Sequence, residues 1–84
     1  MSFMVQYKST PENFSKEYNG LKPNTVRRYE PDDARIRTLK EYLPWENDGY
    51  IMISLANEPR TFFIRRIVDV TFWEDLVIIS WVHQ

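Results

Sequence analysis

The chain is organised around the stretch Gly20-Leu21-Lys22-Pro23-Asn24-Thr25-Val26-Arg27. Glycine is the residue that most easily takes the left-handed conformation just past a helix end, so Gly20 reads as a helix stop. Pro23 bars the helix from resuming and biases the residue before it toward an extended conformation. We therefore predict that a helix ends at Gly20 and that a strand begins after Pro23.

Side chains alternate along that predicted strand. Thr25 and Arg27 should share one face, roughly 7 Å apart, while Val26 and Arg28 share the other. Lys22 stands directly before the proline bend. An ammonium, a hydroxyl and a guanidinium near one turn are groups that a small-molecule or nucleotide site uses. We predict that Lys22, Thr25 and Arg27 converge on one small pocket.

Patterns of apolar and turn residues predict the remaining elements. Strands are expected over residues 3–8, 24–29, 50–56, 61–72 and 76–82, and helices over residues 11–19 and 32–42. A β-hairpin is the alternative for residues 32–42. The first helix should bury Phe14 and Tyr18 and expose Asn13, Ser15, Lys16 and Glu17.

Two further features of the pattern bear on the architecture. The pair Arg65-Arg66 puts charge on both faces in the middle of a long strand, which predicts a bulge or an exit from the core, as barrels use to turn corners. Residues 76–82 are apolar on both faces and are expected to form a central strand. Together the elements predict an α+β fold, namely a small mixed, mostly antiparallel β-barrel with two short helices.

The composition excludes several classes of function. The chain has 84 residues, no cysteine and one histidine. We expect one domain over residues 1–84, without disulfides, cysteine-based zinc sites or a histidine-dependent triad. The longest apolar run, residues 76–82, is far shorter than the roughly 20 residues of a membrane helix, and no signal peptide is recognised. We therefore expect a cytoplasmic protein with no cofactor, no metal and no membrane partner.

The net charge of −1 argues against a protein that holds long nucleic acid by neutralising many phosphates. The charge is uneven, however. Residues 1–45 carry eight basic and six acidic side chains, a balance of +2, whereas residues 46–84 carry three basic and six acidic ones, a balance of −3. A local positive pocket is compatible with this distribution, whereas a broad basic surface is not.

The pattern Gly20-x-Lys22-x-x-Thr25-x-Arg27 resembles the signature of the ASCH domain family, a branch of the PUA-like superfamily of small mixed β-barrels. The resemblance covers residues 20–27 by motif and most of the chain by the order of its elements. It implies a PUA-like barrel, of a small bacterial or phage type, that binds a nucleotide, a modified nucleoside or RNA. The chain departs from the family after the motif, where Glu30-Pro31-Asp32-Asp33-Ala34 replaces the usual Gly-Asp-x-apolar strand opening.

Some bacterial ASCH proteins are amidohydrolases that remove the acyl group from N4-acetylcytidine, with a lysine, a threonine and a glutamate in the proposed catalytic roles. Lys22 and Thr25 match the first two positions, and Glu74 is the best candidate for the acid, with Asp69 and Asp75 as competitors. A lysine base needs its pKa lowered from about 10.4 toward roughly 7–8, which requires burial or a neighbouring cation. The chain is also shorter than the characterised enzymes of this type.

Three functions remain open at this point. The first is binding of a nucleotide, modified nucleoside or RNA, with Arg27 and Arg28 as ligand-binding residues. The second is the amidohydrolase that uses Lys22, Thr25 and Glu74. The third is a small phage or mobile-element protein whose apolar surface docks on a host protein. Each single residue also has an ordinary alternative role, such as a solvated lysine or a surface glutamate.

Overall fold

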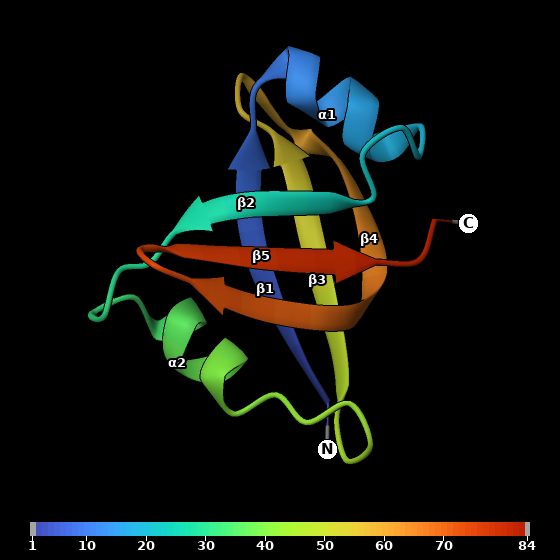
Figure 1. The fold of residues 1–84 in the computed structure, drawn as a ribbon. Coiled ribbons are helices and arrows are strands. Elements are labelled where there is room, and N and C mark those ends of the chain that lie inside the picture. The colour runs from blue at the N-terminus through green and yellow to red at the C-terminus, as the bar shows by residue number, and fades with distance from the viewer. Residues whose placement is uncertain (1, 84) are drawn as a thin grey trace.

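A computed structural model describes residues 2–83 (Figure 1). Along the chain the elements are β1 (Ser2–Ser9), α1 (Pro11–Tyr18), β2 (Asn24–Arg28), α2 (Ala34–Lys40), β3 (Asp48–Leu55), β4 (Glu58–Trp73) and β5 (Leu76–Trp81). The five predicted strands and two predicted helices are confirmed, with ends that differ by a few residues. The hairpin alternative for residues 32–42 is wrong, because α2 occupies that segment.

The strands form one five-stranded sheet in the order β1-β3-β4-β5-β2. β1 pairs with β3 in parallel, and all the other pairs are antiparallel. The fold is therefore α+β with a mostly antiparallel mixed sheet, as predicted. β1 and β2 stand at the two ends of the strand order and the sheet is not closed between them, so a barrel is not confirmed.

The long strand β4 bends the sheet. Its first half pairs with β3 as far as Arg66, and its second half pairs with β5 from Ile67 onward. The register shifts between Ile67 and Asp69, so the predicted irregularity exists but lies just beyond Arg65 and Arg66. Figure 1 shows the consequence: β1 and β3 run across the direction of β2 and β5, and the two halves of the sheet face each other.

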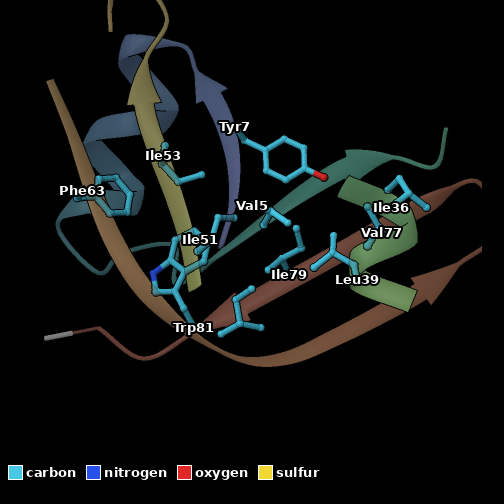
Figure 2. Close-up of a cluster of buried hydrophobic side chains, with 11 residues drawn as sticks. Val5, Tyr7, Ile36, Leu39, Ile51, Ile53, Phe63, Val77, Ile79 and Trp81 are labelled. Atoms are coloured by element: carbon cyan, nitrogen blue, oxygen red, sulfur yellow. The ribbon is translucent and has the colours of Figure 1, made fainter. Parts of the chain in front are cut away.

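Apolar side chains from both halves fill the space between them (Figure 2). The buried cluster consists of Val5, Tyr7, Ile36, Leu39, Ile51, Ile53, Phe63, Ile67, Val77, Ile79 and Trp81. α2 supplies Ile36 and Leu39, while β5 supplies Val77 and Ile79, which are fully buried. Each such aliphatic side chain contributes about 1.5–3 kcal/mol by leaving water. β5 lies between β4 and β2, so the prediction of a central strand is confirmed.

Helix α1 begins as predicted and packs Phe14 against the core as predicted, but it buries Glu17 in place of Tyr18. The Thr10 side chain accepts a hydrogen bond from the backbone N–H of Asn13, and proline stands at the first turn. The prediction that Glu17 faces water is wrong, because this residue is only 1% exposed. Tyr18, predicted to be buried, is 52% exposed. Polar partners on β1 and β2, described below, make the inward position of Glu17 tolerable.

The turn after α1 follows the predicted conformation. Gly20 has a φ of +82°, and a Cβ at this position would stand 2.8 Å from the ring of His83. The Lys22 backbone N–H donates to the carbonyl of Lys16 at 3.1 Å, which closes the turn before Pro23. β2 then starts at Asn24, so glycine and proline end the helix and start the strand as expected.

Candidate functional site

A pocket of about 490 Å³ lies between the unpaired edges of β1 and β2, beside the start of α2. We call the gap between these two edges the seam. Four basic side chains, those of Lys8, Arg27, Arg28 and Arg35, line it together with two acidic ones, those of Glu30 and Asp33. Gln6, Tyr7 and Ser54 complete the wall. The pocket is therefore positive on balance, although the whole chain carries a net charge of −1.

Arg27 is held in place by three hydrogen bonds, two of which cross from β2 to β1. Its Nε donates to Thr25 Oγ1 at 2.9 Å, its Nη2 to Ser9 Oγ at 2.9 Å and its Nη1 to the backbone carbonyl of Lys8 at 2.8 Å. The guanidinium thus satisfies a peptide group on the unpaired edge of β1, where no neighbouring strand does so. Burial lowers the pKa of Arg27 from its ordinary value, whereas the Glu17 carboxylate raises it.

Behind Arg27 lies a buried polar chain that reaches α1. Ser9, which is 4% exposed, donates through Oγ to the Glu17 carboxylate at 2.7 Å and accepts from Arg27 through the same oxygen. A buried carboxylate is costly unless it is hydrogen-bonded and near a positive charge. Ser9 and Arg27 supply both conditions, so the helix, β1 and β2 are joined by one network.

Arg35 closes the other side of the pocket. Its Nε and Nη2 donate to the two carboxylate oxygens of Asp33 at 2.7–3.1 Å, and its Nη1 donates to the carbonyl of Gln6 at 2.7 Å. Asp33 is also the N-cap of α2, accepting from the Arg35 backbone N–H. The hydrogen bonds from Arg35 hold the pKa of Asp33 below its usual range. The stabilisation from this pair is therefore present at neutral pH and is lost only as the pH falls through that lowered pKa.

Tyr7 lies beneath both guanidiniums. The Cζ atoms of Arg27 and Arg35 stand 4.8 Å and 4.1 Å from the centre of its ring. Figure 2 shows the ring extending from β1, away from Ile53. Burial raises the pKa of Tyr7, although the two arginines oppose the rise. Within residues 2–83 the buried hydroxyl has no hydrogen-bond partner, so a neutral donor remains unused next to two cations.

The structure brings together only part of the predicted site. Arg27 and Arg28, the predicted ligand-binding residues, both line the pocket. Thr25 contacts Arg27 but is 2% exposed and lies beneath it, where it orients the guanidinium. Lys22 is not among the lining residues. Of the three residues that were expected to converge on one pocket, only Arg27 lines it, and Thr25 contacts Arg27 from beneath.

The acid proposed for catalysis lies away from Lys22. In the pairing of β2 with β5, Asn24 faces Ser80 and Arg28 faces Leu76, so Lys22 stands beyond one end of this pair and Glu74 beyond the other. A strand of this length spans roughly 15 Å. The two other candidates for the catalytic acid have contacts of their own. Asp69 accepts a hydrogen bond from Thr71 Oγ1 at 2.8 Å, and Asp75 Oδ2 lies 3.9 Å from Arg28 Nη1. This arrangement does not favour the amidohydrolase.

Glu74 instead carries backbone strain, which makes a prediction about stability. Its φ is +52°, a conformation that asparagine takes more readily than glutamate. Glu74→Asn should therefore raise the free energy of unfolding by about 0.5–1 kcal/mol in urea denaturation followed by tryptophan fluorescence. Glu74→Gln removes the same charge without easing the backbone and should leave stability within about 0.3 kcal/mol. If the two substitutions change the free energy of unfolding equally, backbone strain at Glu74 does not reduce stability as described.

Several pocket residues escaped the sequence reasoning. Tyr7 and Lys8 belong to β1, which was interpreted only as a strand, and Arg35 was interpreted only as part of a helix. The spacing Asp33-x-Arg35 at the start of α2 was the available signal, since a capping aspartate can fix an arginine two residues later. No comparable signal marked Glu17, because its burial depends on residues from two other elements.

The described part of the chain, residues 2–83, contains no group of three or more His, Cys, Asp or Glu side chains placed to hold a metal ion. None of its helices is long and apolar enough to cross a membrane.

None of the family models, curated proteins or solved structures compared with this chain matches it. The resemblance to the ASCH family therefore rests on the motif at residues 20–27 and on the order of the elements.

Proposed function

We propose that the protein binds the phosphate of a nucleotide, free or within RNA, in the pocket between β1, β2 and α2. The observation that carries this proposal is the pair of guanidiniums of Arg27 and Arg35, each fixed by hydrogen bonds to protein groups. A guanidinium has five N–H donors. Each of these two uses three nitrogens on partners within residues 2–83, so N–H groups remain to meet a bound anion.

Electrostatics supports an anionic ligand. Arg35 is close enough to Arg27 to lower its pKa, a like-charge repulsion that adds to the effect of burial. Fixed cations that repel one another are stabilised when an anion binds between them. The exposed ammonium of Lys8 and the guanidinium of Arg28 line the same space. The volume of about 490 Å³ falls within the range of ordinary small-ligand sites and accommodates a mononucleotide.

We also propose that the fold is of the ASCH type, within the PUA-like barrels. An ASCH-type, PUA-like barrel that is open at the seam between β1 and β2 would place a nucleotide or RNA ligand near the motif strand, which is β2. Arg27, the last residue of the motif, lines the pocket, and this location supports the assignment. Lys22 does not take part, so the proposal does not include its use as a base.

A titration of the 15N-labelled protein with uridine 5′-monophosphate tests the pocket, with uridine as the matched ligand that lacks phosphate. The monophosphate should shift the backbone amide signals of Tyr7, Lys8, Arg27 and Arg35, whereas uridine should shift them little. Lys8→Ala should weaken monophosphate binding about 5-fold, because it removes one exposed cation from the pocket. Binding should also weaken as salt is raised.

Lys16→Ala provides the control, since it removes one exposed positive charge from α1, outside the pocket. This variant should bind the monophosphate as the parent protein does. The proposal is wrong if uridine and its monophosphate shift the same signals equally, or if neither ligand perturbs the pocket.

A further inference from the structure

The outer face of the first half of the sheet forms a second surface next to the pocket. Val5, Tyr7, Ile51, Ile53 and Phe63 point into the core, so the alternate residues point outward. The register of β1, β3 and β4 arranges the outward residues in three rows: Met4, Tyr50 and Arg66; Gln6, Met52 and Ile64; Lys8, Ser54 and Phe62. We call these nine residues the outer sheet face.

This face carries apolar and aromatic side chains that are open to solvent. Met4 is 44% exposed, Ile64 40% and Phe62 50%, and Tyr50 and Met52 are half-buried. Figure 1 shows α1 and α2 at the ends of the sheet. An uncovered sheet face with aromatic side chains is a surface on which unpaired bases can stack.

The charge of the outer sheet face suits a polyanion. Two of its nine residues, Lys8 and Arg66, are basic. The next outward residue of β3, Asp48, is acidic and is paired with Arg66 at 3.3 Å, so the unbalanced positive charge lies at Lys8. That end of the face is the one nearest the pocket.

The outer sheet face and the pocket are continuous. Gln6, Lys8 and Ser54 belong to both, because they point outward from β1 and β3 and also line the pocket. Phe62 neighbours Ser54 across the β3–β4 pair. A phosphate held by Arg27 and Arg35 would therefore stand at the edge of the surface that bears Phe62, separated from it by Lys8 and Ser54.

We infer that the ligand is single-stranded nucleic acid, with one phosphate in the pocket and the adjoining bases stacked on the outer sheet face, Phe62 first. This inference rests on the proposed function and extends it from a mononucleotide to a strand. A strand is favoured over a protein partner because the face joins a cationic pocket and its unbalanced charge, that of Lys8, is positive. Contacts to stacked bases are tolerant of sequence, so affinity should depend more on strand length than on base identity.

The test compares a 5′-phosphorylated uridine hexamer with uridine 5′-monophosphate at the same salt concentration, using fluorescence anisotropy and amide shifts. The hexamer should bind at least about 10-fold more tightly. Phe62→Ala should weaken hexamer binding about 10-fold, within the range observed when one base-stacking side chain is removed. Trp73→Ala removes a more exposed aromatic ring, 63% open to solvent, from outside the face and should change hexamer binding less than about 2-fold.

The results separate this inference from the proposed function. If the monophosphate binds the pocket and the hexamer binds no more tightly, the inference is overturned and the pocket stands. If the hexamer binds through Phe62 but neither ligand shifts the amide signals of Arg27 and Arg35, the pocket is wrong, and the inference, which puts a phosphate there, is overturned with it. Dimers that dissociate in Phe62→Ala, with no response of the face to the hexamer, would identify a second copy as the occupant and overturn the inference.

Discussion

Replacement of Arg27 by alanine is expected to lower the free energy of unfolding by about 3 kcal/mol. The substitution removes hydrogen bonds to Thr25, to Ser9 and to the carbonyl of Lys8. It also removes a positive charge that interacts with the Glu17 carboxylate, which is 1% exposed. Urea denaturation followed by tryptophan fluorescence measures this loss. The comparison requires that the free energy of unfolding falls with urea concentration at the same slope in the variant and in the parent protein.

Arg28→Ala is the matched control, because it removes the same side chain one position along β2. Arg28 is exposed and its ion pair with Asp75 is 3.9 Å long, between side chains that are 73% and 71% open to solvent. Such pairs contribute little, so the loss should stay below about 0.5 kcal/mol. If the two variants lose the same stability, the network around Arg27 does not hold the seam as described.

Replacement of Glu17 by alanine should have an effect of similar size, about 2–4 kcal/mol. The carboxylate is the acceptor for Ser9 Oγ at 2.7 Å, and its removal leaves a small cavity and deprives the buried Ser9 O–H of this acceptor. Glu17→Gln keeps the shape and an acceptor oxygen but loses the charge, so about 1–2 kcal/mol is expected. The same denaturation measurement applies to both variants.

Glu12→Ala on the same helix is the control for Glu17. Its side chain is 81% exposed in an ion pair with Lys16, and its loss should cost no more than about 0.5 kcal/mol. The double variant of Glu17 and Arg27 should lose less than the sum of the single losses, because both act through Ser9. Additive losses would contradict a shared network.

The elements were predictable because their signals are local. Gly20 and Pro23 restrict their own backbone conformation, and Thr10 and Pro11 start α1 within one turn. Neither the turn nor the helix start depends on residues that are distant in the sequence. The apolar run of β5 predicted its central place for the same reason. Closure of the sheet was not predictable in this way, since it depends on whether β1 and β2 pair across the whole chain.

The site was predicted only where the strand pattern was sufficient. Alternation along β2 put Thr25 and Arg27 on one face, and they contact at 2.9 Å. Lys22 was expected to join them, but its position lies beyond the strand, where alternation no longer fixes direction. Glu17 was assigned to solvent on polarity alone, because a sequence does not show that Ser9 and Arg27 will meet it.

A crystal structure of the protein grown with a nucleoside 5′-monophosphate tests the central claim most directly. The account predicts the phosphate between Arg27 and Arg35, with oxygens within hydrogen-bond distance of free N–H groups on both guanidiniums. A phosphate bound elsewhere, such as beside Lys22, or a pocket that stays empty at saturating ligand would contradict it.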